Sequence, residues 1–197
     1  MNKRFLILSV LLVGIFLAFR FCGNKPEQEK VPEQKPAPLS SAVSGSFTES
    51  FAKMLQSYYS LKEAFMNADT VKANSAATML SANSDSLKVE EITGDTSGTI
   101  RETAKYFAGT ISGSAKALSA EPKTEDKLRE FNMITDALWG LTRTVKYDGE
   151  KVYYQFCSEA FDSTGAYWLS NSIDKGNPYI SNKTCSEVRD SLDYGRK

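Results

Sequence analysis

The sequence predicts an all-α fold: an antiparallel four-helix bundle with an irregular C-terminal cap that contains a short extended segment. Apolar residues recur at spacings of three and four in four separate stretches between residues 47 and 147, and this is the period of a helix with one buried face. Turn-forming residues then follow in quick succession from Asp148 onwards. The part that is expected to fold is about 150 residues long, the size of one domain with a single core.

Large apolar residues mark the first predicted helix, and smaller ones mark the second. The buried face of the first consists of Phe47, Phe51, Met54, Leu55, Tyr58, Leu61, Ala64 and Phe65. Asp69 or Thr70 is suited to cap the second helix, whose stripe of small residues favours close packing. That stripe consists of Val71, Ala73, Ala76, Ala77, Leu80 and Leu87. The polar segment 84–98 is then expected to be a long connection.

The third predicted helix has the most regular apolar stripe in the chain. It consists of Ile100, Ala104, Phe107, Ala108, Ile111, Ala115 and Leu118. Gly109 and Gly113 form a ridge of small residues on a neighbouring face, so we expect another helix to pack closely there. Thr124 is expected to cap the fourth helix, with Glu125 and Asp126 at its positive end. Its buried face consists of Leu128, Phe131, Ile134, Leu138 and Leu141.

Residues 148–195 are predicted to form an irregular module that wraps one end of the bundle. Residues 151–157 alternate and are rich in Val and Tyr, which is typical of a short strand or an extended cover segment. Residues 186–192 are expected to form a short last helix, which would bring Cys185 back towards Cys157.

The first 21 residues, 1–21, are predicted to be a signal peptide or a membrane anchor. Two basic residues precede an apolar run over 5–19, which is short for a helix that needs about 20 apolar residues to span a bilayer. Cys22 follows directly and is expected to be the lipidated first residue of a lipoprotein. The alternative is an uncleaved anchor in which Arg20 reaches the interface.

Cysteine counting favours the lipoprotein. Lipidation of Cys22 leaves the exported domain an even pair of cysteines in an oxidising compartment. We therefore expect the chain in the cell envelope, facing the periplasm and held at the membrane by its N-terminal lipid or anchor.

Residues 22–46 are expected to be a disordered tether, and residues 47–195 the single folded domain, divided into the helical bundle 47–147 and the irregular module 148–195. The tether has hardly an apolar side chain, so it cannot bury enough surface to offset chain entropy. The chain has 24 basic and 24 acidic residues, and three of the basic ones precede Cys22. The mildly acidic remainder lacks the basic patch that nucleic-acid binding requires, so we expect no nucleic-acid partner.

The chain has no histidine, which removes the commonest general base, the commonest zinc ligand and every Ser-His or Cys-His nucleophile. It also has no Cys-x-x-Cys and no Gly-x-Ser-x-Gly motif. Carboxylates are plentiful but are expected to be solvated surface charges. We therefore predict no catalytic residues and no enzymatic activity. An enzyme built on carboxylates is the remaining alternative.

The stretch 152–185 has a particular order of residues. Its distinctive positions are Tyr154, Cys157, Ala160, Gly165, Ala166, Trp168, Leu169, Ser170, Ile173, Asn177, Pro178, Tyr179 and Cys185. In this order the chain resembles a bacterial domain of unknown function. That domain occurs alone on secreted or lipid-anchored proteins and at the C-terminus of periplasmic adaptor subunits of copper and heavy-metal efflux pumps. The resemblance extends more loosely over 47–192, and it implies a periplasmic setting and a role in metal handling.

Both methionines of the family pattern are missing, because Glu159 and Lys183 stand in their places. Soft sulfur ligands select Cu(I), so copper is the cofactor that the resemblance implies, with Cys157 and Cys185 as a degenerate metal site. Three interpretations of this pair stay open. In an oxidising compartment it forms a disulfide; kept reduced, it holds Cu(I); otherwise the thiols are buried and behave as small apolar groups.

Tyr154, Trp168, Asn177 and Tyr179 are the candidates for a binding surface, since Trp and Tyr are enriched where one edge of a ring stays wet. The alternative is packing, because a module with few aliphatic residues must bury its rings. We predict a non-enzymatic binding or accessory protein of the cell envelope, linked to copper or heavy-metal handling. The alternative is an interaction module that binds an envelope protein and has a structural disulfide and no metal role.

Overall fold

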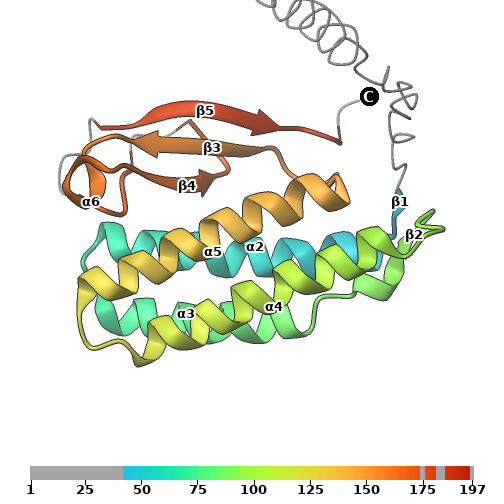
Figure 1. Ribbon diagram of the computed structural model, residues 1–197, viewed down its shortest axis with the longest axis horizontal. Coiled ribbons are helices and arrows are strands. Elements are labelled where there is room, and N and C mark those ends of the chain that lie inside the picture. Colours follow the sequence, from blue (N-terminus) through green and yellow to red (C-terminus); the bar gives the residue numbers. More distant parts are fainter. Residues whose placement is uncertain (1–41, 174–175, 181–184, 196–197) are drawn as a thin grey trace, which may run out of the picture. The chain divides into compact units, whose positions relative to one another are not determined.

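Most of the chain that the structure describes is helical. The computed structural model describes residues 42–173, 176–180 and 185–195 (Figure 1). Within these residues the long helices are α2 (Gly45–Met66), α3 (Thr70–Asp85), α4 (Thr99–Ala120) and α5 (Thr124–Val145). An antiparallel sheet follows, made of β3 (Val152–Cys157), β4 (Ala166–Ser170) and β5 (Glu187–Leu192). The predicted helical character is confirmed, but the all-α class is wrong, because the C-terminal part pairs into a sheet.

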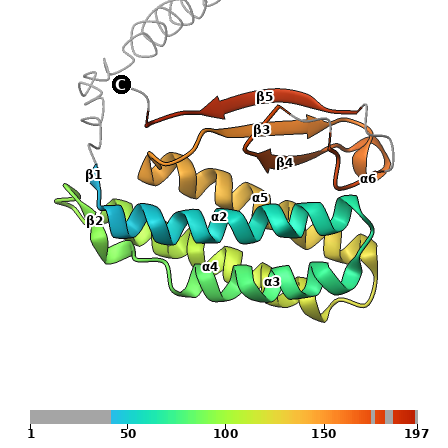
Figure 2. The same cartoon turned by 180° about the vertical axis from the view of Figure 1, so that it is seen from behind.

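Each long helix packs against the next one in the chain: α2 on α3, α3 on α4 and α4 on α5. The sheet lies on the side of α2 and α5, with α3 and α4 beyond them, as both views show (Figure 1 and Figure 2). Strand order in the sheet is β4-β3-β5. Because β4 makes the contacts with α5 and α2, it is the inner edge of the sheet, and β5 is the outer edge.

The apolar stripes that predict the helices form the core. Fully buried side chains come from all four long helices and include Phe47, Phe51, Leu80, Ile111, Leu118, Phe131 and Ile134. Each such side chain contributes about 1.5–3 kcal/mol to folding. Val71 is an exception, with 75% of its surface exposed. It lies in the first turn of α3, and the buried stripe of that helix starts at Ala73.

Two of the long helices begin with a side chain that accepts a hydrogen bond from a backbone N–H group of the first turn. Ser44 accepts a hydrogen bond from the Phe47 N–H at the start of α2 (3.1 Å), and Asp69 accepts one from the Lys72 N–H at the start of α3 (2.9 Å). Asp69 is therefore confirmed as a cap. The predicted cap at Thr124 is wrong, because Thr124 is already the first helical residue of α5.

A buried lysine joins three of the helices. Lys127 of α5 is 4% exposed and donates to the Leu118 carbonyl near the end of α4 (2.7 Å) and to Asn74 Oδ1 of α3 (2.8 Å). A cation near the C-terminus of a helix is favoured by the helix dipole. The two acceptors compensate the ammonium for the water that it loses on burial.

The predicted connection 84–98 has more structure than expected. It contains the short helix η1 (Val89–Glu91) and the strand β2 (Ile92–Thr93), which pairs antiparallel with β1 (Ala42–Val43). Regular structure therefore begins before the expected domain start at Phe47.

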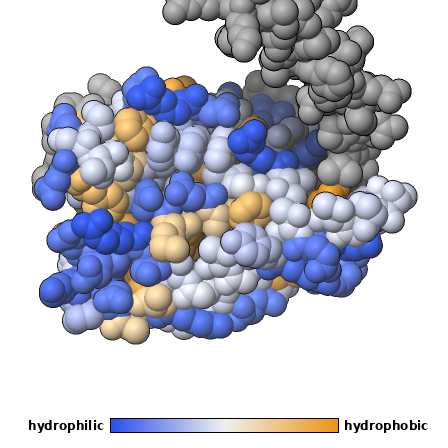
Figure 3. Space-filling view, in the orientation of Figure 1, coloured by the Kyte–Doolittle hydropathy of each residue, from blue (hydrophilic) through white to orange (hydrophobic). Residues whose placement is uncertain are grey.

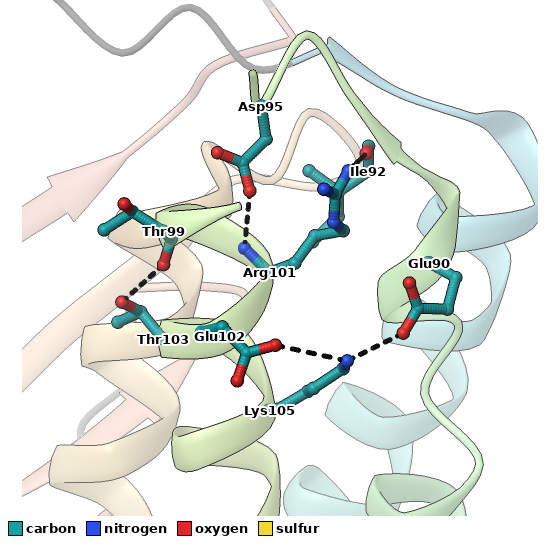
Figure 4. A network of polar contacts seen from close by, with 8 residues as sticks. All are labelled: Glu90, Ile92, Asp95, Thr99, Arg101, Glu102, Thr103 and Lys105. Atoms are coloured by element: carbon teal, nitrogen blue, oxygen red, sulfur yellow. Dashed lines mark hydrogen bonds and ion pairs between the residues drawn. The ribbon is translucent and has the colours of Figure 1, made fainter. Parts of the chain in front are cut away.

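Charged side chains fasten this connection to the start of α4 (Figure 4). The Asp95 carboxylate accepts a hydrogen bond from the Arg101 N–H (2.9 Å), and Lys105 bridges Glu90 and Glu102 (2.8 and 3.4 Å). The hydrogen bond from Lys105 lowers the pKa of Glu90, and the attraction between the two charges adds to this. These charged groups bond to one another or to the backbone, and together they hold the connection against the first turns of α4.

The ridge of small residues on α4 makes no close contact. A Cβ atom added at Gly109 or at Gly113 would meet nothing within 4 Å in the structure, so the expected close helix contact is wrong. The close approach occurs instead at Gly140 of α5. A Cβ atom there would lie 2.6 Å from the ring of Phe107, so α4 and α5 pack with this ring seated over the glycine.

Residues 187–192 form β5, so the predicted last helix is wrong. β5 pairs with β3, with a register irregularity between Tyr154 and Gln155. The side chains from Glu187 to Asp190 are all exposed, so this segment has no apolar face with which to pack as a helix. Instead, the backbone N–H and C=O groups of β5 form hydrogen bonds with β3.

The N-terminal predictions lie outside the described residues. They are the signal peptide or anchor over 1–21, the lipidation of Cys22 and most of the tether over 22–46. Within the described part of the chain, no helix is long and apolar enough to cross a membrane.

Candidate functional site

The inner edge of the sheet is closed by polar side chains from the helices and from the loop after β4. The Leu169 N–H donates to Tyr58 Oη (3.0 Å), and the Tyr167 N–H donates to Asn132 Oδ1 (3.3 Å). The Tyr167 carbonyl accepts from Tyr179 Oη (2.6 Å). An edge strand presents unpaired backbone groups, and these three side chains pair those of β4.

Tyr58 extends this network into the core. Its hydroxyl shares a hydrogen bond with Thr135 (2.7 Å), and both residues are fully buried. Burial raises the pKa of Tyr58, so the hydroxyl stays neutral. The network is therefore structural, since no ligand reaches it.

Asn177 ties the loop after β4 to the second cysteine. Its Oδ1 accepts from the N–H groups of Tyr179 (2.8 Å) and Ile180 (3.3 Å), and its Nδ2 donates to the Cys185 carbonyl (2.9 Å). An asparagine that bonds to the backbone two residues further on forms an Asx turn. The Asn-Pro-Tyr sequence thus folds the loop back upon itself.

Cys157 and Cys185 form a disulfide, with their Cα atoms 5.2 Å apart. The bond joins the end of β3 to the residues just before β5. Of the three interpretations of the pair, the disulfide is confirmed. Sulfur atoms bonded to each other are not the thiolates that bind Cu(I), so in this oxidised form the pair is not a copper site. Nor do the described residues contain a group of three or more His, Cys, Asp or Glu side chains that could hold a metal ion.

The four residues predicted as a binding surface do not form one surface. Trp168 is fully buried and Asn177 nearly so, although both belong to the loop that the disulfide closes. Tyr179 is partly exposed, but its hydroxyl bonds to the Tyr167 carbonyl. Tyr154 is partly exposed and lies against α5.

Tyr154 belongs to a stack of aromatic rings that runs from α5 across the sheet. Trp139 of α5 stacks on Tyr154 (centroids 4.6 Å apart, planes within 3°), and Tyr154 stacks on Tyr167 (4.5 Å, 6°). Tyr167 in turn contacts Phe156 (4.6 Å). We call these four residues the aromatic stack. Because its rings cover one another's faces, it presents edges to the solvent and not the open cage of faces that binds an ammonium group.

Charged groups flank the aromatic stack. Tyr154 Oη donates to Asp136 Oδ1 of α5 (3.2 Å), and the Arg189 guanidinium of β5 lies 4.8 Å from the centre of the Phe156 ring. Partial burial raises the pKa of Asp136, although the hydrogen bond from Tyr154 opposes this. Burial, together with the charge of Asp136, also raises the pKa of Tyr154. Rings bordered by polar groups are typical of protein interfaces.

Two large apolar side chains are exposed on the helices α5 and α4. Met133 lies one turn from Asp136 on α5, and 53% of its surface is exposed. On α4, Tyr106 is 70% exposed and contacts the ring of Phe107. Figure 3 shows apolar atoms in the middle of this face, over α5 and towards α4. We call Tyr106, Phe107 and Met133 the α4–α5 surface.

Lys62 and Ser170 form a contact that sequence reasoning missed. The ammonium of Lys62 donates to Ser170 Oγ (3.1 Å). Serine and lysine act as nucleophile and base in some hydrolases, but there the lysine must accept a proton, and the nucleophile must be accessible. Here Ser170 is fully buried. The pair connects α2 with the end of β4.

Sequence reasoning also missed the residues of α5 that face the sheet. Asn132, Asp136 and Trp139 stand four and three residues apart, so they share one side of the helix. This row of two polar residues and one aromatic residue beside the apolar stripe was the sequence pattern that could have indicated a second packing face of α5.

Residues 54–148 match the family model of a protein of unknown function (DUF3347). The predicted domain of unknown function is thereby confirmed. Comparisons with curated proteins and with solved structures give no match.

The DUF3347 match covers the helices from within α2 to just beyond α5. Trp139, Asp136 and the α4–α5 surface therefore lie inside the matched region. The sheet, with the disulfide and the other rings of the aromatic stack, lies outside it.

Proposed function

We propose that this chain is a non-enzymatic binding protein of the cell envelope, which binds a protein partner through the aromatic stack and the α4–α5 surface. The observation that carries the proposal is a row of stacked rings, of which Tyr154, Phe156 and Tyr167 are partly exposed, together with the exposed side chains of Tyr106 on α4 and Met133 on α5. Aromatic residues, Met and Arg are enriched at the centres of protein interfaces. Rings that are already held by stacking lose little further entropy on binding.

The proposed setting is the periplasmic face of a bacterial membrane. The apolar run 5–19 and Cys22 support attachment through a lipid or through an uncleaved anchor. The disulfide supports an oxidising compartment. In this proposal the four helices act as an antiparallel four-helix bundle that presents the sheet to the partner.

Copper or heavy-metal handling, as in the efflux adaptors that the sequence resembles, is the second candidate. The observation that favours it is the Cα separation of 5.2 Å between Cys157 and Cys185, which would leave two thiols within reach of one ion after reduction. Without the family's methionines, the site would hold Cu(I) with two sulfur ligands. This function requires a reductant, whereas the binding of a partner does not.

Photo-crosslinking in the native cells tests the proposed function. A photoreactive phenylalanine analogue is placed at Tyr106 or at Met133 of the full chain, and irradiation is expected to give one adduct of the same mass from both positions. Position 71 provides the control, because Val71 is more exposed than either residue and lies outside the proposed surface. Adducts that form equally well from position 71, or none from the other two, would contradict the proposal.

A further inference from the structure

The two cysteines of the disulfide differ in their access to solvent. Cys157 ends β3, the middle strand of the sheet, and pairs with Ala166 of β4. Its exposed fraction is 1%, so an external molecule cannot reach its sulfur in the folded state. Cys185 stands just before β5, the outer edge of the sheet, and is partly exposed. The folded protein therefore shields one side of the disulfide and not the other.

Local opening of the sheet favours the same side. Strand β3 is bonded to both β4 and β5, whereas β5 is bonded to β3 along one edge and has exposed side chains from Glu187 to Asp190. Segments with few buried contacts open at a lower free energy than the centre of a fold does. An opening that begins at the outer edge of the sheet uncovers Cys185 before it frees Cys157 from β4.

Two hydrogen bonds hold the backbone around Cys185. Asn177 Nδ2 donates to the Cys185 carbonyl (2.9 Å), and Ser186 Oγ donates to Gln155 Oε1 (2.7 Å). Both Asn177 and Gln155 are buried. The Cα atoms of the two cysteines lie 5.2 Å apart, so a Cys185 sulfur that has bonded to an external group would stay within reach of Cys157. Such proximity favours the second, intramolecular step over attack by another molecule.

We infer that Cys185 is the exchange site of this disulfide, at which an external disulfide or thiol forms a mixed disulfide, and that Cys157 is the resolving cysteine. During oxidation the Cys185 thiol loses its proton to water and attacks one sulfur of the external disulfide. A new S–S bond forms, the external S–S bond breaks, and one external thiolate leaves.

Cys157 completes the oxidation. Its thiol loses a proton to water, and the thiolate attacks Cys185 Sγ. The protein disulfide forms, and the second external thiolate leaves, so the external disulfide gains the two electrons that the cysteine pair loses. Reduction by external thiols runs through the same mixed disulfide in reverse. This inference does not rest on the proposed docking function, and either one can fail alone.

Reaction of the full-length variants Cys157→Ser and Cys185→Ser with oxidised glutathione tests the inference. The variants are matched, because both lack the disulfide. Mass spectrometry follows each cysteine in its own peptide, so Cys22 does not contribute. Cys185 should react at least about tenfold faster than Cys157 in the folded variants and at about the same rate in concentrated urea. Equal rates in the folded variants, or a faster reaction of Cys157, would overturn the inference.

The oxidised wild type repeats the test without a substitution, and it decides if either variant no longer unfolds cooperatively. It is treated briefly with reduced glutathione, quenched with acid and alkylated. Glutathione should be found on Cys185 and the alkyl group on Cys157. The opposite pattern, an equal mixture, or no adduct under conditions in which the urea-denatured protein forms one, would overturn the inference.

The same variants in the native cells separate two sources of the external disulfide. After an acid quench, Cys157→Ser is expected to have a mixed disulfide on Cys185. A larger species on a non-reducing gel would support the inference with a thiol–disulfide oxidoreductase as the source, and an adduct of the mass of a small thiol would support it with a small disulfide. An equal yield through Cys157 in Cys185→Ser, or no adduct on Cys185, would overturn it.

Discussion

Lys127 and Lys62 are both almost fully buried, and each connects parts of the fold that are far apart in the chain. Lys127 bonds to Asn74 and to the Leu118 carbonyl, and Lys62 bonds to Ser170. A buried ammonium is tolerated where acceptors replace the water that it loses. At the scale of single residues, such contacts specify which elements meet, because the apolar stripes fit several arrangements.

Lys127→Met tests this role. The change keeps the apolar stem but leaves Asn74 Oδ1 and the Leu118 carbonyl without their donor, so we expect a loss of about 1–3 kcal/mol in the free energy of unfolding. Urea denaturation measures it. Lys116→Met is the matched control, since Lys116 is exposed and pairs with Asp85 at the surface, and it should change stability by less than about 0.5 kcal/mol. Equal losses in the two variants would contradict the argument.

Asp136 gives a prediction for the pH dependence. Its pKa is raised in the folded state, first by partial burial, so the folded protein holds this proton more tightly than the unfolded chain does. The stabilisation is present below the ordinary pKa, near 4, and is lost as the pH rises through the raised pKa. Asp136→Asn keeps an acceptor for Tyr154 and removes the titration.

The stability of Asp136→Asn relative to the wild type should therefore increase as the pH rises through this window and stay constant above it. Urea denaturation from about pH 3.5 to pH 7 measures the difference. A difference that does not change with pH would show that the carboxyl titrates alike in the folded and unfolded states.

At the scale of elements, the two edges of the sheet differ. The β4 edge is closed by Tyr58, Asn132 and Tyr179. The β5 edge carries exposed charged side chains from Glu187 to Asp190, which discourage strand addition. β5 is held by β3 on one side and by the disulfide just before its start.

Removal of the disulfide should loosen β5 first. The bond closes a loop with a sequence separation of 28, so Cys157→Ser with Cys185→Ser should lower the free energy of unfolding by about 3 kcal/mol in the chain-entropy model. The rate of amide hydrogen exchange should increase more in β5 than in α2 or α5. The reduced wild type is the control and should behave like the double variant. Unchanged stability of both would contradict a fastening role.

The helices could be predicted from the sequence, because their period is local and three or four residues suffice to show it. The sheet could not. β5 has no apolar alternation, and its pairing depends on β3, more than thirty residues earlier in the chain. The bond between Leu169 and Tyr58 joins residues separated by 111 positions, and no local pattern reports such a contact. For the same reason Trp168 and Asn177 were predicted at a surface, although both are buried.

At the scale of the whole molecule, the helices and the sheet depend on each other. The DUF3347 match ends at residue 148, yet Tyr58 and Phe131, which are fully buried, lie against β4 and Tyr179. A chain that ends at residue 150 would expose these side chains. We expect it to keep helical circular dichroism, to lose cooperative unfolding and to bind a hydrophobic dye. A truncated chain that unfolds cooperatively without binding the dye would show that the matched region folds alone.

We propose that the disulfide between Cys157 and Cys185 fastens a binding module and that this pair does not hold copper in the cell. Alkylation of Cys157 and Cys185 in the protein isolated from its native envelope without a reductant, followed by mass spectrometry, tests it most directly. We predict that neither cysteine is alkylated before reduction and that both are alkylated after it, with no copper released. If both thiols are alkylated before reduction and one bound copper ion is released, the proposal is contradicted. That result would support a function in metal handling.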